Sequence, residues 1–424
     1  MLILYSFALL LVLAVGAPWW LFRMATSGKY REGLTERLGF VPRRVRECDA
    51  GASVLWVHAV SVGEVLAASR LIEELTRKLA ERGGRWRVVV STTTRTGQKL
   101  ARERFGSDRV FYFPLDFAFP VRAWLRALRP RVLVLAETEF WPRMLMECRR
   151  AAVPVAVVNA RISDRSWPRY RRMAGLWKRL LRGLAVVLAQ TPLDAERLQA
   201  LGAANVHVGG NLKFDVRATQ PAPASAALRE QIPPEVRILV CGSTLSGEEE
   251  MLLDAMPDDA VMILAPRHPE RFEAVAQLLR RHGSPWLRRS AWIEHPTPIA
   301  RGTVFLLDSI GELASVYSLA ELAFVGGSLL PYGGHNPLEP AQFGVAILTG
   351  PSYENFRGIV ETLRAQNAIR IVEPDELRDA LAGMLADSAS SRAMGERARR
   401  VFESEAGATS RAVTAILTLL EGPA

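Results

Sequence analysis

Residues 321–350 read ELAFVGGSLLPYGGHNPLEPAQFGVAILTG, and this stretch shows how the fold is built. Apolar runs at its two ends have the composition of buried strands, and a short helix is expected just before the second of them. The intervening loop, residues 326–341, holds four glycines, three prolines, a histidine, an asparagine and a glutamate. Because a simple turn needs only one glycine, this loop predicts a ligand that approaches the backbone closely.

The same alternation of short apolar runs and amphipathic segments covers most of the chain. Strand–helix alternation predicts parallel sheets with helices on both faces. The expected strands are 54–60, 86–92, 109–114, 131–137, 153–160, 184–190, 205–210, 237–243, 260–266, 303–308, 321–327, 345–350 and 368–373.

The alternation is interrupted at residues 215–235, DVRATQPAPASAALREQIPPE, where proline, alanine and polar residues dominate. This composition predicts a linker between two doubly wound α/β domains, at 23–214 and 236–424. Such domains bind ligands outside the carboxyl ends of their strands. Since every polar motif of the chain follows an expected strand, we expect the two domains to face each other across one ligand-binding cleft.

The N-terminus predicts a membrane anchor. Residues 2–22, LILYSFALLLVLAVGAPWWLF, are uncharged and long enough to span a bilayer. The basic residues between 23 and 46 favour a cytoplasmic location for everything that follows. No charge precedes the apolar run and no cleavage site follows it, so residues 1–22 are expected to remain as an uncleaved anchor.

Composition limits the possible partners. The 424 residues carry a net charge of +10 and a pI near 10.0, which suggests a polyanion: a nucleic acid, an acidic membrane surface or a phosphorylated substrate. Richness in arginine for reasons unrelated to function explains the charge equally well. The three cysteines are far apart and predict neither a disulfide framework nor a metal site.

The candidate residues of the first domain are mostly acidic. Gly63 and Glu64 lie at a strand-to-helix turn in HAVSVGEV, where Glu64 is either an ordinary helix-start acid or a general base. Glu137 and Glu139 follow a buried strand, a placement unusual for packing alone. Lys213, one of five lysines, precedes the linker and is either a surface cation or a group that stabilises a phosphate or carboxylate.

Residues 159–183 interleave arginines with Trp167, Tyr170 and Trp177. This pattern fits a surface that binds phosphates or lipid headgroups, and it fits an ordinary amphipathic helix equally well.

The second domain has polar loops after four of its strands, which together predict a nucleotide site. Arginine can bind a phosphate with two hydrogen bonds, a glycine-rich loop before a helix suits phosphate, and an acid one turn later suits ribose hydroxyls. The candidates are Ser243, Thr244, Arg267, His268, Gly311, Glu312, Gly333, Gly334, His335, Asn336 and Glu339.

Several common sites are excluded by their missing motifs. The sequence contains no GxGxxG after its first strand, no GxxxxGK[ST], no HExxH, no G-x-S-x-G and no DxD that would hold Mg²⁺ on a nucleotide. We therefore expect no dinucleotide, no cofactor and no metal ion.

At these residues the sequence resembles the 3-deoxy-D-manno-octulosonic acid (Kdo) transferases. The motifs that carry the resemblance occur in family order across residues 1–400: YREGLTERLGF, HAVSVGE, AETEFWP, NARISDRS, GNLKFD, APRHPERF and GGSLLPYGGHNPLEPA. The resemblance implies an inverting glycosyltransferase of the GT-B fold, with two facing Rossmann-like domains, at the cytoplasmic face of a bacterial inner membrane. It also implies CMP-Kdo as donor and a phosphorylated lipid A precursor as acceptor.

The resemblance further implies residue roles. Glu64 matches the family's general base, and Glu137 and Lys213 match residues that stabilise the transition state. The implied contacts to CMP are Pro266, Arg267, Ile310, Gly311, Glu312, Asn336, Pro337, Leu338 and Glu339.

Three other functions remain open at this point. Another GT-B enzyme using a UDP-sugar on a membrane lipid would share the architecture and the basic residues. A membrane-tethered, non-catalytic nucleotide-binding protein is a second alternative, although Glu64, Arg267 and Glu339 are present. Nucleic-acid binding is suggested by charge alone, and because no recognition motif supports it we expect no nucleic-acid partner.

Overall fold

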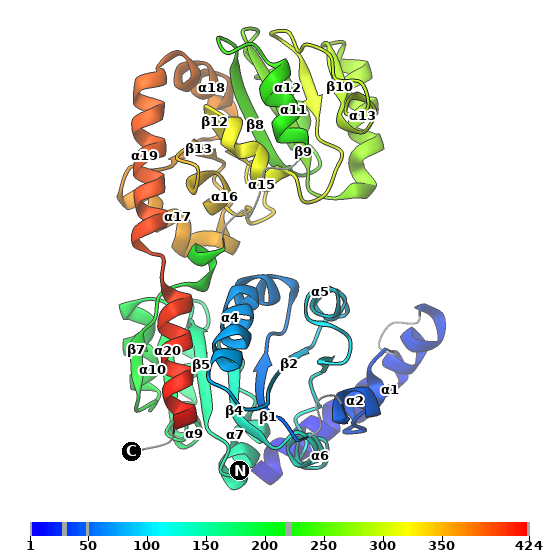
Figure 1. Ribbon diagram of the computed structural model, residues 1–424, viewed down its shortest axis with the longest axis vertical. Helices are drawn as coiled ribbons and strands as arrows, with labels where there is room; N and C mark the ends of the chain where they lie inside the picture. The colour runs from blue at the N-terminus through cyan, green and yellow to red at the C-terminus, as the bar shows by residue number, and fades with distance from the viewer. Residues whose placement is uncertain (1, 28–31, 48–50, 217–222, 422–424) are drawn as a thin grey trace. The chain divides into compact units, whose positions relative to one another are not determined.

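The computed structural model describes residues 2–27, 32–47, 51–216 and 223–421, which form two compact units (Figure 1). The first unit comprises residues 1–216 and 406–424, and the second comprises residues 217–405.

The first unit is built on a seven-stranded parallel sheet with the order β3-β2-β1-β4-β5-β6-β7. Its strands are β1 Ser53–His58, β2 Trp86–Thr92, β3 Val110–Tyr112, β4 Pro130–Ala136, β5 Val155–Ala160, β6 Val186–Ala189 and β7 Val206–Val208. Its helices are α1 Leu2–Ser27, α2 Leu34–Arg37, α3 Arg43–Arg46, α4 Val62–Glu81, α5 Arg95–Phe105, α6 Ala118–Leu128, α7 Pro142–Arg150, α8 Trp167–Arg172, α9 Ala174–Leu181, α10 Pro192–Ala200, η1 Leu212–Asp215 and α20 Ala408–Glu421.

Both faces of this sheet are buried. Along β1, Val54 and Trp56 belong to the apolar cluster that α6, α7, α9 and α10 cover, whereas Leu55 and Val57 belong to the cluster that α4 and α20 cover. Because successive strand residues point to opposite faces, this division places helices on both sides of the sheet and confirms a doubly wound unit.

The second unit repeats this plan with the strand order β10-β11-β9-β8-β12-β13-β14, again in parallel. Its strands are β8 Arg237–Thr244, β9 Ala260–Pro266, β10 Trp286–Arg288, β11 Val304–Leu306, β12 Leu322–Val325, β13 Ala346–Thr349 and β14 Arg370–Ile371. Its helices are α11 Pro223–Gln231, α12 Glu248–Asp254, η2 Pro269–Arg271, α13 Phe272–His282, α14 Arg289–Trp292, α15 Leu313–Val316, η3 Tyr317–Leu319, α16 Leu338–Ala341, η4 Glu354–Phe356, α17 Arg357–Ala365, η5 Pro374–Glu376, α18 Leu377–Ala386 and α19 Ser388–Ser404.

Helices also cover both faces of the second sheet. Leu239 and Cys241 of β8 pack in one apolar cluster with α12, α13 and α18, while Ile238 and Val240 pack in another with α11 and η3. The two units therefore share one architecture.

The second unit begins and ends at other residues than the second domain expected from the sequence: it spans 217–405 and not 236–424. Helix α20 packs on the first unit, where Val413 and Ile416 join the cluster beneath α4. The Asp215 carboxylate accepts hydrogen bonds from the Gly407 and Thr409 amides, at 2.6 and 2.5 Å. The expected domain 236–424 is corrected accordingly, because residues 406–424 return to the first sheet.

The expected linker, 215–235, is also shorter than its composition suggests. Residues 223–231 form helix α11, and Leu228 and Ile232 are buried in the core of the second unit. Asp215 belongs to the first unit, and the remaining positions, 217–222, lie outside the described residues.

The predicted membrane anchor at residues 2–22 is not supported. A helix does form there, with Pro18 inside it. Within the part of the chain that the structure describes, however, none of the helices combines the length and the apolar character that crossing a bilayer requires. The Tyr5 hydroxyl instead donates a 2.8 Å hydrogen bond to the buried Asp116 carboxylate, which attaches α1 to the first unit.

Candidate active site

Each sheet has a central point at which the strand order reverses, and several candidate residues follow the strands that flank it. In the first sheet the reversal lies between β1 and β4, and in the second it lies between β8 and β12. Doubly wound sheets bind ligands at the carboxyl ends of such strands, because the connections diverge there and leave a crevice. Glu64 follows β1, and Glu137 and Glu139 follow β4.

Glu64 lies in the first turn of α4 and is held there by a capping box. Ser61 is the N-cap; its hydroxyl donates a 2.9 Å hydrogen bond to one carboxylate oxygen of Glu64, and the Val60 amide donates a 2.7 Å bond to the other. The Ser61 hydroxyl oxygen in turn accepts a 3.5 Å hydrogen bond from the Glu64 amide, one of the amides that the start of the helix leaves unpaired. The helix-start role considered from the sequence is therefore confirmed, and it also fixes the position of the carboxylate.

The environment of Glu64 changes its acidity. The residue is only 9% exposed, and this burial raises the pKa of its carboxyl to about 7. The hydrogen bond from Val60 acts against the rise, while the charges of Glu137 and Glu139 add to it. The pKa of Glu139 is itself raised, first by burial and then by Glu137. The structure thus brings the three acids close enough to interact, and a carboxyl that titrates near neutrality can accept a proton.

Two residues at neighbouring strand ends have left-handed backbones, at φ values of 60° for Glu137 and 58° for Asn159. Non-glycine residues with such angles are uncommon and concentrate at functional sites. The Asn159 side-chain oxygen accepts a 3.1 Å hydrogen bond from the Leu212 amide, which ties η1 and its half-buried Lys213 to the end of β5. Asn159 was not recognised from the sequence, although a polar residue ending a strand of β-branched residues is a usable signal.

The basic segment 159–183 forms α8 and α9 and is amphipathic. Trp167, Tyr170 and Trp177 pack against the apolar core of the first unit, while arginines such as Arg171 and Arg172 are exposed. The aromatic residues therefore serve packing, which matches the simpler of the two sequence interpretations.

In the second unit, a buried carboxylate shapes the loop after β12. Glu248, the first residue of α12, is fully buried and accepts four backbone hydrogen bonds of 2.7–3.0 Å. The donors are the amides of Leu245, Gly327, Ser328 and Leu329. Glu248 therefore connects the loops that follow β8 and β12, the two strands at the reversal point.

Two glycines of the same loop have no room for a side chain. Gly333 and Gly334 have φ values of 88° and 73°. A Cβ atom on Gly333 would lie 2.4 Å from the Asn355 side chain, and one on Gly334 would lie 2.9 Å from the Ser352 carbonyl oxygen. These glycines are required by the fold of the loop itself, which is one answer to its unusual composition.

Several candidates of the second unit interact electrostatically. Burial raises the pKa of Glu339, whereas the Arg267 charge and a hydrogen bond from Asn336 oppose this rise. Burial, Arg267 and His268 lower the pKa of His335 to about 4, so this imidazole is neutral at pH 7. Arg267 itself is exposed. Glu339, Asn336, His335 and His268 therefore belong to one electrostatic group with the exposed Arg267 guanidinium.

A second group follows β11. Glu312 is buried and accepts a 2.9 Å hydrogen bond from Arg289, and the Ser309 hydroxyl also donates to it. Gly311 has a φ value of 87°, and the neighbouring Ile310 is 78% exposed. Arg289 was not recognised from the sequence.

Other candidates have side chains occupied by the fold. The Thr244 hydroxyl donates a 3.0 Å hydrogen bond to Glu249, which also binds Arg271. Ser243 is buried with a φ value of 57°, and the Leu338 side chain lies in the core. The sequence-predicted residues Pro266 and Pro337 are buried as well.

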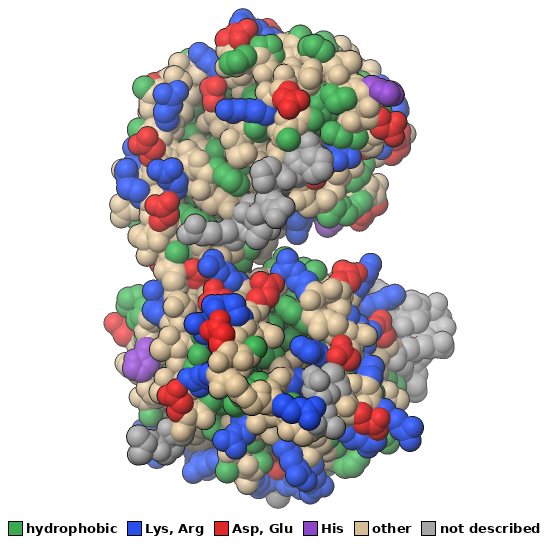
Figure 2. All heavy atoms as spheres, in the orientation of Figure 1, with side chains coloured by type: hydrophobic (Ala, Val, Ile, Leu, Met, Phe, Trp, Pro, Cys, Tyr) green, Lys and Arg blue, Asp and Glu red, His purple; other side chains and the backbone are tan. Residues whose placement is uncertain are grey.

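The candidates of each unit follow the ends of its strands, and the expected cleft between the domains stays a prediction. No three His, Cys, Asp or Glu side chains gather to hold a metal ion among the residues that the structure describes. On the face shown in Figure 2, basic and acidic side chains are interspersed over both units.

Comparison with known proteins gives the family. Residues 32–216 match the family model described as 3-deoxy-D-manno-octulosonic-acid transferase (kdotransferase). The chain is 31% identical over 408 residues to a 3-deoxy-D-manno-octulosonic acid transferase of Haemophilus influenzae, covering 93% of each chain. It is 34% identical over 387 residues to one of Bordetella pertussis, covering 86% of this chain and 87% of the relative.

A solved structure supports the fold alone. The chain resembles MurG of Acinetobacter baumannii with a TM-score of 0.54 at 15% identity, over 87% of this chain and 99% of that one. This likeness and the two parallel sheets agree with the expected GT-B architecture. The extent and identity of the sequence matches show that the chain belongs to the 3-deoxy-D-manno-octulosonic acid transferase family and is a glycosyltransferase.

Proposed function

We propose that the chain transfers Kdo from CMP-Kdo to a phosphorylated lipid A precursor, with inversion at the Kdo anomeric carbon and with Glu64 as general base. The observation that carries this proposal is the Glu64 carboxyl: it begins a helix at the reversal point of the first sheet, and its pKa lies at about 7. In a Kdo transferase, an acid that can take a proton at working pH is suited to activate the acceptor.

The proposed step is a single displacement. Glu64 accepts the proton of an acceptor hydroxyl while the hydroxyl oxygen forms a bond to the anomeric carbon of Kdo. The bond from that carbon to the phosphate oxygen of CMP breaks, and its electron pair leaves with CMP. Attack from the face opposite the leaving group inverts the centre. Glu137 and Lys213 are proposed to stabilise charge as it develops.

The second unit is proposed to bind CMP. Arg267 is exposed, so its guanidinium can neutralise the single phosphate of the donor without a bridging metal ion. Arg267 also interacts electrostatically with Glu339. Asn336 and Glu339 are proposed to bind the ribose hydroxyls. Ile310 offers apolar surface to the base.

The donor is tested by titrating the purified chain with CMP and with UDP in a calorimeter. The proposal predicts clear binding of CMP and weaker binding of UDP; preference for UDP would instead favour the alternative of a UDP-sugar transferase. The acceptor is tested by incubating the chain with CMP-Kdo and a defined lipid A precursor. The product mass should increase by whole Kdo units, and an unchanged acceptor would contradict the acceptor assignment.

A further inference from the structure

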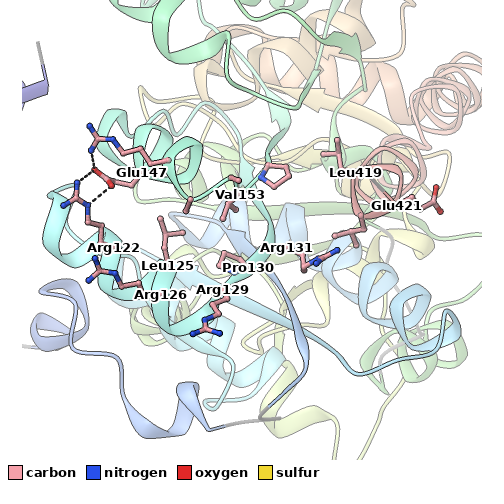
Figure 3. Close-up of a pocket in the computed structure, with 15 residues that line it drawn as sticks. Arg122, Leu125, Arg126, Arg129, Pro130, Arg131, Glu147, Val153, Leu419 and Glu421 are labelled. Carbon is pink, nitrogen blue, oxygen red and sulfur yellow. Dashed lines mark hydrogen bonds and ion pairs between the residues drawn. The ribbon is translucent and has the colours of Figure 1, made fainter. Parts of the chain in front are cut away.

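The first unit has a large cavity at the amino ends of its strands (Figure 3). Its volume is about 790 Å³, and it opens where β4 and β5 begin, whereas Glu64 and Glu137 follow the ends of their strands. Its walls come from the C-terminal ends of α6, α7 and α20. The lining residues include Leu125, Pro130, Val153, Pro154, Leu419 and Leu420, which give it an apolar floor.

Arginine dominates the charge of this cavity. Five arginines line it, against the two carboxylates Glu147 and Glu421. The lining arginines are Arg122, Arg126, Arg129, Arg131 and Arg150.

Both carboxylates already have partners. Glu147 binds Arg122 through two hydrogen bonds of 2.7 and 3.2 Å, and it binds Arg143 and Arg150 through ion pairs of 2.9 and 2.7 Å. One negative charge is thus shared by three guanidinium groups. Glu421 forms an ion pair with Arg82, which does not line the cavity.

Within the described part of the chain, three arginines of the lining have no acidic partner. Arg126, Arg129 and Arg131 are exposed and form no hydrogen bond or ion pair through their side chains with any residue in the described ranges. The negative end of the α6 dipole accounts for Arg126, which lies in the last turn of that helix. It does not account for Arg131, the only exposed residue of β4.

Arg129 occupies a position that favours glycine. It ends α6 with a φ value of 44°, and Ala152, which lies in the turn after α7 and also lines the cavity, has a φ value of 53°. Glycine is the usual residue in this conformation because it has no Cβ. Arg129 therefore occupies a backbone position that favours glycine, and its guanidinium lines the cavity.

We propose that this cavity binds a phosphate ester carrying two or more negative charges, with the phosphate held by Arg126, Arg129 and Arg131 and the carbon-containing part on the apolar floor. Guanidinium groups bind phosphate oxygens through paired hydrogen bonds, and an anion offsets the positive charge that these arginines bring to the cavity. The ligand is either the headgroup of an anionic phospholipid or a soluble phosphate ester. This site is separate from the proposed CMP site, which lies in the second unit.

The test uses the full chain and two double variants of equal charge. Arg126→Gln with Arg131→Gln removes two arginines of the cavity and leaves the strained Arg129 turn intact. The control, Arg85→Gln with Arg104→Gln, removes two exposed arginines of the same unit that do not line this cavity. Unfolding temperatures of the three proteins establish that each is folded.

Sodium pyrophosphate is titrated in the presence of saturating CMP, so that the proposed nucleotide site is occupied. Sedimentation with phosphatidylcholine vesicles, with and without phosphatidic acid, forms the second arm. We expect the cavity variant to lose about tenfold or more in affinity in at least one arm, while the control stays within about twofold. Loss only with phosphatidic acid identifies a lipid headgroup, and loss with pyrophosphate identifies a soluble ester.

The proposal is overturned if the unaltered chain binds neither probe, or if both double variants lose affinity equally. The outcome does not depend on transfer of Kdo, because binding is measured without donor or acceptor. A failure here therefore leaves the proposed function untouched, and a failure of Glu64 as base leaves this site untouched.

Discussion

Glu64 and Glu248 begin helices at corresponding places in the two units, after β1 and after β8, yet their surroundings differ. The Glu64 carboxylate accepts hydrogen bonds from one backbone amide and one hydroxyl, and it interacts with two other acids. The Glu248 carboxylate accepts hydrogen bonds from four backbone amides. Hydrogen bonds from the fold occupy both carboxylate oxygens of Glu248, whereas burial and two acidic neighbours raise the pKa of Glu64. One architecture thus holds an acid with a raised pKa in one unit and an acid that connects two loops in the other.

The largest effect is expected from Glu64→Gln. The amide keeps the shape of the side chain but cannot accept the proton, so the transfer rate should fall by about two to four orders of magnitude. Affinity for CMP should stay nearly constant, because CMP is assigned to the second unit. The assay is Kdo transfer, with calorimetry for CMP. Glu73→Gln, an exposed residue of the same helix, is the control and should be neutral. A loss below tenfold would remove Glu64 from the role of base.

Glu248→Gln should act on structure instead. An amide NH₂ would face backbone N–H donors, leaving buried groups unpaired, so the free energy of unfolding of the second unit should fall by about 2–4 kcal/mol. CMP affinity should fall with it, because the loop after β12 loses its anchor. Scanning calorimetry and CMP titration measure both effects. Glu250→Gln, exposed in the first turn of the same helix, should change neither. Equal effects of the two substitutions would contradict the structural role of Glu248.

The pH dependence of transfer sharpens the same comparison. A base must be deprotonated, so kcat/KM should rise as the pH increases through the Glu64 pKa of about 7 and level off above it. The substitution Glu139→Gln removes one negative charge near Glu64, so the Glu64 carboxyl should ionise more easily. The rise of kcat/KM with pH should therefore move to lower pH by about half a unit. If the pH at which kcat/KM rises does not move, the rise reflects the ionisation of a group other than Glu64.

A smaller loss of stability than that of Glu248→Gln is expected from Gly333→Ala. Its φ of 88° and the nearby Asn355 side chain make a Cβ costly, by about 1–3 kcal/mol of unfolding free energy. Gly358→Ala is the matched control, because nothing lies within 4 Å of a Cβ there and the residue is inside α17. The control should be neutral or slightly stabilising in thermal unfolding. If both variants unfold alike, the loop does not need its glycine.

Strand positions were predicted well because both faces of each sheet are buried and the strands read as continuous apolar runs. Strands β2 and β9 begin and end where expected, at 86–92 and 260–266. Strand β10, Trp286–Arg288, was not predicted: it has three residues, all half-buried, and lies at the edge of its sheet. Helix α20 has a readable apolar face, but nothing in its residues says which sheet it covers.

The site was predictable where its geometry is local. Ser61 and Glu64 are three residues apart, so the capping box can be read directly from the sequence. The role of Glu248 could not be read in this way, because it is one of three consecutive glutamates and three of its donors lie about eighty residues later. The raised pKa of Glu64 could not be predicted from the sequence either, because its burial depends on how the whole unit packs.

The return of α20 to the first unit bears on how the chain folds during synthesis. Ribosomes release the N-terminal part first, and domains usually fold in that order. Here the first sheet lacks part of its cover until residues 408–421 emerge, after the whole second unit has been made. Helix α20 therefore completes the first unit only after the second unit has been synthesised, and until then the apolar surface beneath it stays exposed.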